Sequence, residues 1–124
     1  MDKYGLNSLE RLEHISGVIR RIFSFCDGKS EAEFLSDKML NSGVLYQFLI
    51  IGEAIQYVET DILKKYSYPS HLPRSFRNYI THEYVGINLR QVYKTVKDLL
   101  PDFIVLIDKM IQQEGECTSN SDQK

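Results

Sequence analysis

The sequence contains few of the residues that build disulfide-bonded, metal-binding or membrane proteins. It has no tryptophan, three prolines and two cysteines, Cys26 and Cys117. Two cysteines form no disulfide framework and suit a reducing cytosol, so each is expected to be an inert thiol. There is no apolar run of about 18 residues and no apolar N-terminal segment, and we expect neither membrane insertion nor secretion. No carboxylate cluster, His-x-x-x-His pair or cysteine pair has metal-ligand spacing, so we predict a cytoplasmic protein without a metal or other cofactor.

What the chain does contain is enough apolar sequence for one domain and an uneven distribution of charge. Of its 124 residues, 43% are apolar, which allows a modest core. The net charge of −2 alone argues against nucleic-acid binding. Residues 1–63 carry 6 Lys/Arg and 10 Asp/Glu, residues 64–97 carry 7 and 1, and residues 98–124 carry 2 and 6. The middle segment, at +6, has the balance of a phosphate-binding patch. Chance clustering of charges on solvated faces is the alternative.

Apolar residues recur at three- and four-residue spacing and predict an all-α fold. Long helices are expected over residues 4–26 and 37–66, from about residue 73 to residues 82–84, and from residue 88 onward. Ser30 followed by Glu33 predicts a capped short helix between the first two. The stretch 44–55 is apolar nearly all round and should be the most buried. We predict an antiparallel bundle of four main helices plus short extras.

The ends of the predicted helices follow from local signals. Residues 67–73 contain two prolines and are expected to form a loop. Gly86 is a plausible terminator of the third helix, and Asn88 can cap the next one. Pro101 cannot continue a regular hydrogen-bond ladder, so we expect a kink or restart there. Residues 1–113 are predicted to form a single domain, and residues 114–124 a flexible polar tail.

The segment 77–84 has the highest density of side chains that can bind phosphate or move a proton. It reads Arg77-Asn78-Tyr79-Ile80-Thr81-His82-Glu83-Tyr84. On a helix, Arg77, Thr81 and Tyr84 share one stripe, and Asn78 and His82 share the neighbouring one. Asn78 lies one turn before His82 and can hydrogen-bond its imidazole. Arg77 and His82 diverge by about 140°, so two copies of the helix across a two-fold axis would build a better cleft than one.

Glu53 lies within the most apolar predicted helix, where a carboxylate needs a partner. One interpretation is a salt bridge or cap interaction inside the bundle. The other is that Glu53 faces the cleft and orients Arg77 or His82. The sequence leaves both open.

The pattern Arg-x4-His-x-Tyr resembles that of the HepT-like branch of the HEPN superfamily. Three flanking segments match this branch as well: Ile50-Ile51-Gly52-Glu53-Ala54, Leu72-Pro73 and Leu99-Leu100-Pro101. The resemblance extends from about Leu6 to Ile111. It implies an all-α homodimer that sets two motif helices face to face. It also implies a metal-independent ribonuclease toxin and an antitoxin of the MNT nucleotidyltransferase type.

The residue types in the motif suit cleavage of RNA (mRNA or tRNA). A base must take the proton of the 2′-hydroxyl, an acid must protonate the leaving 5′-oxygen, and the phosphorane charge must be stabilised. Histidine, with an unperturbed pKa near ~6.5, serves either proton role, and arginine offers a permanently charged fork for phosphate oxygens. DNA lacks the 2′-hydroxyl and should be spared.

The resemblance assigns roles residue by residue. Arg77 corresponds to the phosphate-stabilising arginine, His82 to the general acid/base, and Asn78 to the polar residue that often follows the arginine. Apart from the resemblance, Glu53 and Thr81 are candidate supporting residues. Tyr84 corresponds to the tyrosine that the antitoxin modifies with AMP, which would add bulk and negative charge beside an RNA site. Glu83, between His82 and Tyr84, is expected to affect the turnover rate more than the identity of the reaction.

Two other interpretations remain. The protein could be a non-catalytic, nucleotide-binding partner of a small nucleotidyltransferase, or a dimeric helical scaffold whose motif pins the dimer. Taken singly, Arg77 is more often a surface ion-pair residue, His82 a histidine at a helix C-terminus, and Tyr84 an edge of the core. Their joint spacing and the basic patch favour the phosphate-handling site.

Overall fold

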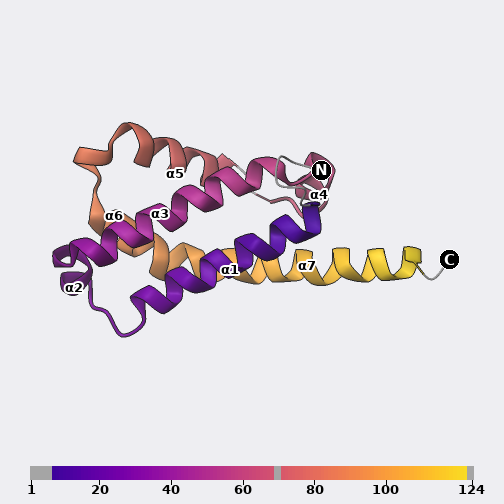
Figure 1. The fold of residues 1–124 in the computed structure, drawn as a ribbon, viewed down its shortest axis with the longest axis horizontal. Helices are drawn as coiled ribbons and strands as arrows, with labels where there is room; N and C mark the ends of the chain where they lie inside the picture. Colours follow the sequence, from indigo (N-terminus) through magenta and orange to yellow (C-terminus); the bar gives the residue numbers. More distant parts are fainter. Residues whose placement is uncertain (1–6, 69–70, 123–124) are drawn as a thin grey trace.

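The chain forms a bundle of helices. The computed structural model describes the backbone of residues 7–68 and 71–122 and, within it, the side chains of all residues except 71, 84 and 117–122. In this described part every regular element is helical (Figure 1). The elements are α1 (Ser8–Cys26), α2 (Glu31–Ser36), α3 (Lys38–Ala54), η1 (Ile55–Tyr57), α4 (Thr60–Lys65), α5 (His71–His82), η2 (Tyr84–Gly86), α6 (Leu89–Lys94), η3 (Thr95–Leu99) and α7 (Leu100–Asp122). The predicted all-α class, with four long helices and short extras, is confirmed.

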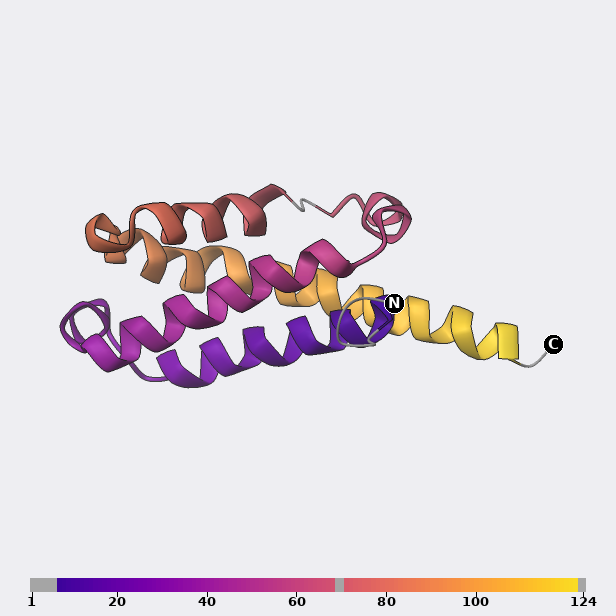
Figure 2. The ribbon, with the colours of Figure 1, turned by 45° about the horizontal axis from the view of Figure 1, so that its top comes forward.

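The long helices are arranged around α1 and α3. α3 packs between α1 and α5, and α7 also packs against α1 (Figures 1 and 2). The C-terminal part of α7 extends beyond the other helices (Figure 2). In the described part of the chain, no helix is both long and apolar enough to cross a membrane.

One continuous core holds these helices together. The largest fully buried side chains are Leu12, Ile15, Ile19, Ile22, Phe34, Ile55, Ile80, Ile107 and Met110. They come from α1, α2, η1, α5 and α7, so the hydrophobic effect ties segments that lie far apart in the sequence. Cys26 is buried in the same core, and this burial raises the pKa of its thiol.

Polar caps set where several helices begin. The Asn7 side chain accepts from the Glu10 amide at 2.8 Å, and Ser30 accepts from the Glu33 amide at 3.1 Å, in each case as part of a capping box. The Asn88 side chain caps α6 by accepting from the Gln91 amide at 3.2 Å. The capping box predicted at Ser30 and the cap predicted at Asn88 are both confirmed.

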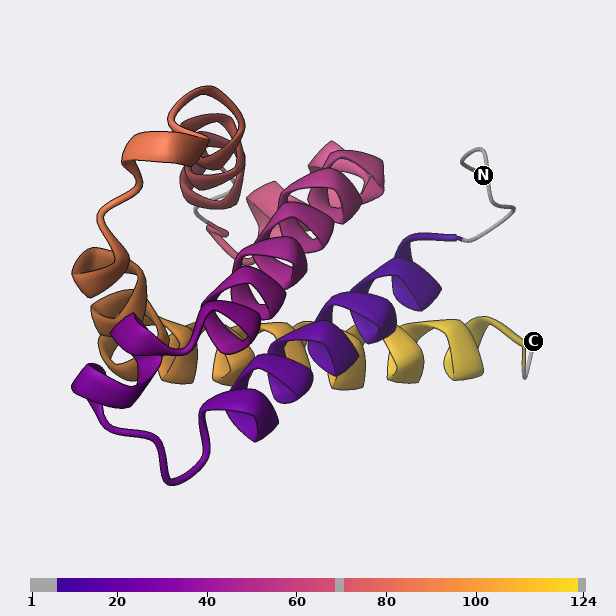
Figure 3. The same cartoon turned by 60° about the vertical axis from the view of Figure 1, so that its left-hand side comes forward.

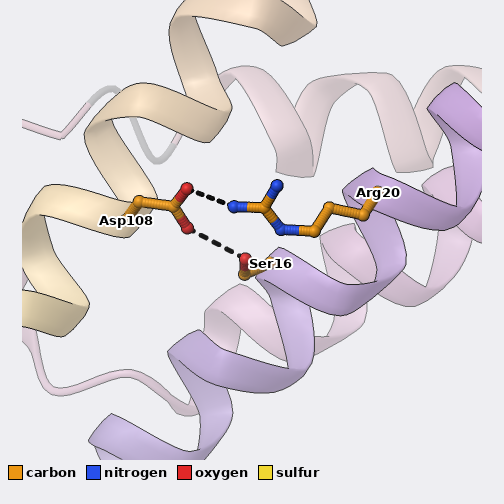
Figure 4. A network of polar contacts seen from close by, with 3 residues as sticks. All are labelled: Ser16, Arg20 and Asp108. Carbon is orange, nitrogen blue, oxygen red and sulfur yellow. Dashed lines mark hydrogen bonds and ion pairs between the residues drawn. The ribbon is translucent and has the colours of Figure 1, made fainter.

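A polar cluster joins α1 to α7 beside the core. The Ser16 hydroxyl donates to Asp108 Oδ1 at 3.0 Å, and Arg20 forms an ion pair with the other carboxylate oxygen (Figure 4). Ser16 is buried, whereas Arg20 and Asp108 are substantially exposed. The hydrogen bond therefore satisfies a buried hydroxyl, while solvent screens much of the ion pair.

The second predicted helix, residues 37–66, is divided into three elements. The backbone becomes extended at Val58 (φ −85°, ψ 133°) between η1 and α4. Val58 is buried there, and the Glu59 amide donates to the Ser8 hydroxyl at the start of α1, 2.9 Å away. Tertiary contacts thus interrupt a continuous helical pattern, and the prediction of one helix was wrong.

Residues 44–55 are the most buried stretch of the described residues, as predicted, although α3 is not buried all round. Val44, Phe48 and Ile51 are buried, but Tyr46 is 61% exposed, and Leu49 and Ile50 are only half-buried. One stripe of α3 therefore lies outside the core, because α1 and α5 pack on its flanks and leave the outer face uncovered.

Two helix ends and one internal turn also differ from the predicted pattern. α5 begins at His71, so Pro73 lies in its first turn, where the missing N–H costs nothing. Residues 69–70 of the predicted loop lie outside the described residues. Before Pro101, η3 is a π-helical turn in which the Leu100 amide donates to the Thr95 carbonyl. This wider turn accommodates the proline ring without ending the helix.

The helix expected to end near residue 113 continues to Asp122. Glu114, where the tail was predicted to begin, accepts from the Tyr66 hydroxyl at 2.6 Å and from Lys65 Nζ at 2.9 Å. These contacts, which join α7 to the end of α4, extend the helix past residue 113. The division into a domain of residues 1–113 and a flexible tail remains a prediction.

Candidate functional site

The candidate site begins with an unusually close crossing of α3 and α5. A Cβ atom placed on Gly52 of α3 would lie 2.5 Å from Arg77 Cβ and 2.9 Å from the Pro73 carbonyl oxygen of α5. Only glycine leaves room for this crossing, because carbon atoms normally approach no closer than about 3.5 Å. Figure 3 shows α5 nearly end-on, on the side of α3 away from α1. The absent side chain thereby brings Arg77 onto the surface of α3.

The crossing places the Arg77 guanidinium beside the carboxylate of Glu53, the residue that follows Gly52. Arg77 Nη2 lies 3.3 Å from Glu53 Oε2, and the two side chains are 35% and 40% exposed. Glu53 thus forms an ion pair with Arg77, which fits both the salt-bridge interpretation and the orienting role that the sequence leaves open. A partly exposed ion pair of this kind stabilises the fold little, but it fixes the direction of the guanidinium.

Arg77 and Glu53 line an open groove of about 570 Å³ on the surface formed by α1, α3 and α5. The polar residues of this groove are Arg11 and His14 from α1, Glu53 from α3, and Arg77 and Thr81 from α5; its apolar floor is Leu49, Ile50 and Ala54 of α3. We call it the Arg77 groove. Thr81 is held in place because its hydroxyl donates to the Arg77 carbonyl at 2.9 Å. The partly exposed Arg77 guanidinium can bind an anion here, whereas Arg11 is almost fully buried.

Arg11 and His14 were not identified from the sequence. They are one turn apart on α1, and Arg11 is only 3% exposed, with its guanidinium 4.9 Å from the centroid of the Tyr57 ring. Partial burial lowers the pKa of the His14 imidazole, and the positive charges of Arg11 and Arg21 lower it further. The signal that could have revealed this wall is the position of Arg11 on the apolar stripe it shares with Ile15 and Ile22.

Asn78 and His82 lie away from the Arg77 groove. Both side chains are exposed, and neither contributes to the groove lining. Within the described residues they make no hydrogen bond to each other, so the predicted Asn78–His82 contact is not formed. The divergence of Arg77 and His82 around the helix is as predicted, and a single chain does not bring the two side chains together.

The end of the motif is a short turn outside α5. α5 stops at His82, four residues before the terminator suggested by Gly86, and η2 follows. The Gly86 amide donates to the Glu83 carbonyl at 2.8 Å. The side chain of Tyr84, the predicted AMP acceptor, lies outside the described residues. Val85, beside it, is fully exposed, so the turn itself is open to solvent.

The opposite side of α5 packs on the core. Ile80 is buried, and the ring of Phe76 stacks on Phe48 of α3 with centroids 4.6 Å apart. The Tyr79 hydroxyl accepts from the Asn88 amide at 2.9 Å, which fixes the turn after the motif. Behind α5 lies a largely apolar cavity of about 430 Å³. These contacts hold α5 so that Phe76, Tyr79 and Ile80 face the core and the polar residues of the helix face outward.

The geometry suits binding and turnover of a phosphodiester. Arg77 supplies a partly exposed guanidinium, and the same groove contains the His14 imidazole. Over the part of the chain with described side chains, no group of three or more His, Cys, Asp or Glu residues is placed to hold a metal ion.

Comparison with known proteins points to ribonucleases. A family model described as ribonuclease HepT-like matches residues 15–110. A provisionally named RNase from Caldanaerobacter subterraneus is 27% identical over 104 residues, which cover 83% of this chain and 93% of that protein. Another, from Methanocaldococcus jannaschii, is 30% identical over 100 residues, covering 79% and 83%. A protein named probable ribonuclease HepT, from Thermococcus cleftensis, is 29% identical over 100 residues, covering 80% and 91%. No solved structure gives a significant match.

Proposed function

Because the chain belongs to the HepT-like ribonuclease family of the HEPN superfamily, we propose that it is a metal-independent endoribonuclease toxin. Its substrate is RNA, and it cleaves by transesterification, with the 2′-hydroxyl as nucleophile and a 2′,3′-cyclic phosphate as product. The observation that carries this proposal is the position of Arg77. Its guanidinium is aimed by Glu53 at 3.3 Å and remains open to solvent in a groove that attracts phosphate.

Arg77 is proposed to stabilise the charge that develops on the phosphorane. The guanidinium is permanently charged and can bind two phosphate oxygens at once. Glu53 and Thr81 support it, the first through the ion pair and the second through its hydrogen bond to the Arg77 carbonyl. Removing such a stabilising donor costs about 3–4 kcal/mol in the transition state.

His82 is proposed to transfer protons, with Asn78 beside it on the same exposed stripe. Because His82 points away from the Arg77 groove of its own chain, the proposal requires two copies. Two motif helices facing each other across a two-fold axis would bring the His82 of one copy toward the Arg77 of the other. The exposed Tyr46 of α3, on the stripe that continues into the groove, supports a second copy at this face.

Neutralisation is proposed to occur through Tyr84, by transfer of AMP from a nucleotidyltransferase antitoxin. Support comes from the other tyrosines of this region. The Tyr79 hydroxyl accepts from the Asn88 amide, and the Tyr93 hydroxyl donates to the Lys29 carbonyl at 2.8 Å, so both are engaged within the fold. Tyr84→Phe should keep toxicity and escape modification. Modification of that variant would move the acceptor to Tyr79 or Tyr93.

The proposal is tested by incubating total RNA with the purified protein in EDTA. Wild type should cleave and leave cyclic phosphate ends, whereas His82→Ala and Arg77→Ala should not. Arg74→Ala is the matched control, because Arg74 is an exposed arginine of α5 that does not line the Arg77 groove. Near-normal cleavage by either His82→Ala or Arg77→Ala would refute the assigned role.

The same preparation distinguishes the alternative, a nucleotide-binding partner subunit. If a folded dimer without AMP on Tyr84 cleaves no RNA, the ribonuclease proposal fails. Binding of ATP or AMP that is lost in Arg77→Ala would then identify the Arg77 groove as a nucleotide site.

A further inference from the structure

The Arg77 groove contains a histidine that the motif does not include. His14 stands on α1, one turn from Arg11, and α3 separates this wall from the one formed by Arg77 and Thr81. Its imidazole is exposed enough to meet a ligand. His82, by contrast, is exposed on a different face of α5 and does not line the groove. Within a single chain, the imidazole that shares the groove with Arg77 is therefore His14.

The charges around His14 are asymmetric. From its own helix, Arg11 and Arg21 face it; from α3 there is Glu53, and from α5 there is Arg77. Glu53 is engaged by Arg77 at 3.3 Å. On the α7 side, Asp108 accepts a hydrogen bond from Ser16 and forms an ion pair with Arg20, and it does not line the groove. The positive charges of Arg11 and Arg21 disfavour the imidazolium, and the Arg77 guanidinium can bind phosphate oxygens in the same groove.

A neutral imidazole beside a bound phosphate is suited to accept a proton. The pKa of His14 is lowered below its usual value, first by partial burial and then by Arg11 and Arg21, so the ring is unprotonated at neutral pH. Transesterification needs both a base and an acid. The motif histidine can serve as only one of them at a time, and the groove supplies the second.

We propose that His14 is a further catalytic residue, the general base that takes the proton of the RNA 2′-hydroxyl in the Arg77 groove. This inference rests on the proposed ribonuclease function. The 2′-oxygen forms its bond to phosphorus as its proton passes to an imidazole nitrogen of His14. Arg77 binds the phosphorane oxygens, the bond from phosphorus to the 5′-oxygen breaks, and the 5′-oxygen takes a proton from the acid, His82 of the second copy.

The test compares His14→Ala with Glu13→Ala in the full-length protein. Glu13 is the matched control because it is the preceding, exposed residue of α1 and does not line the groove. His14→Ala should lower kcat by at least about 100-fold, the usual contribution of a general base. Binding of an uncleavable 2′-O-methyl RNA should stay within about threefold of wild type, because Arg77 remains. Glu13→Ala should match wild type in both measurements.

Two further measurements separate catalysis from a structural role. Free imidazole should restore part of the cleavage by His14→Ala, because the groove is open to solvent. The pH profile of kcat/KM for wild type should fall on the acid side at the lowered pKa of His14, and this limb should disappear in His14→Ala. A merely structural role would give neither result.

The outcomes separate this inference from the proposal on which it rests. If wild type cleaves RNA and His82→Ala does not, but His14→Ala cleaves within about threefold of wild type, the role of His14 is refuted and the ribonuclease stands. Loss of 2′-O-methyl RNA binding by His14→Ala without imidazole rescue also refutes it. If wild type cleaves no RNA, both proposals fail.

Discussion

The substitution Gly52→Ala adds one methyl group at the place where α3 and α5 touch. The added carbon would lie 2.5 Å from Arg77 Cβ, 2.9 Å from the Pro73 carbonyl oxygen and 3.1 Å from Arg77 Cδ. The first two atoms belong to the backbone of α5 or are attached directly to it, so no side-chain rotation removes the clash. Reaching a normal carbon contact of about 3.5 Å requires the two helices to separate by about 1 Å.

The cost follows from two opposing terms. Overpacking of this kind typically destabilises by about 1–3 kcal/mol, and replacing a helical glycine with alanine returns up to about 1 kcal/mol. The net loss should therefore be about 1–2 kcal/mol, or about 4–8 °C in Tm. The effect on catalysis should be larger, because a displacement of about 1 Å at a catalytic group can cost about 100-fold in rate.

The assay pairs thermal unfolding with RNA cleavage, and Gly17→Ala is the control. Gly17 also lies within a helix, but nothing is within 4 Å of a Cβ placed there. Gly17→Ala should keep its activity and gain up to about 1 kcal/mol of stability. If Gly52→Ala has the Tm and the cleavage rate of wild type, the close crossing does not position Arg77, and this account of the site is wrong.

Three further predictions concern the ion pairs. Glu53→Gln should reduce the rate of RNA cleavage about tenfold, because the Arg77 guanidinium is then held less firmly. The free energy of unfolding should fall by less than about 1 kcal/mol, because the ion pair is partly exposed. An unchanged cleavage rate would show that Glu53 does not orient Arg77. The pKa of Glu114 is lowered by the Tyr66 hydroxyl, so its stabilisation is present above the unfolded value of 4.5 and is lost as pH falls through the lower folded pKa. Circular-dichroism melts at pH 6 to 3 should show a steeper fall in Tm for wild type than for Glu114→Gln. In urea unfolding, Asp108→Ala should lower the free energy of unfolding by about 1–2 kcal/mol. Asp108→Asn should lower it by less than about 1 kcal/mol, because the amide keeps an acceptor for the buried Ser16 hydroxyl. Equal losses in the two variants would contradict this prediction.

Much of the fold could be predicted from local sequence signals. Helical periodicity identified the long helices, and Ser30 and Asn88 marked two starts because a cap depends on residues only three positions apart. The break at Val58 could not be predicted in this way, since it depends on burial in the core and on a contact between Glu59 and Ser8, 51 positions away. Local patterns predict a helix but do not show where tertiary contacts interrupt it.

The sequence predicted the part of the candidate site that lies on α5, but not the part that other helices contribute. Positions on α5 gave the separation of Arg77 from His82, because helical geometry alone determines it. The groove wall on α1 was missed, since Arg11 and His14 are more than 60 positions from Arg77 in the sequence. The structural role of Gly52 was also missed. A glycine that is required because another helix passes close by has the same appearance in the sequence as any other glycine.

The π turn at η3 determines where a residue can be deleted before α7 without rotating that helix. A π turn holds about one residue more than an α turn, so α7 lies one position out of phase with α6 along the sequence. Deleting one residue of Thr95–Leu99, together with Pro101→Ala to remove the clash, would leave a regular α-helix and keep Asp108 opposite Ser16. The same deletion made between Pro101 and Asp108 would turn every later residue by about 100° and carry Asp108 off that face. η3 is therefore the place where this helix can lose a residue without changing which side chains face α1.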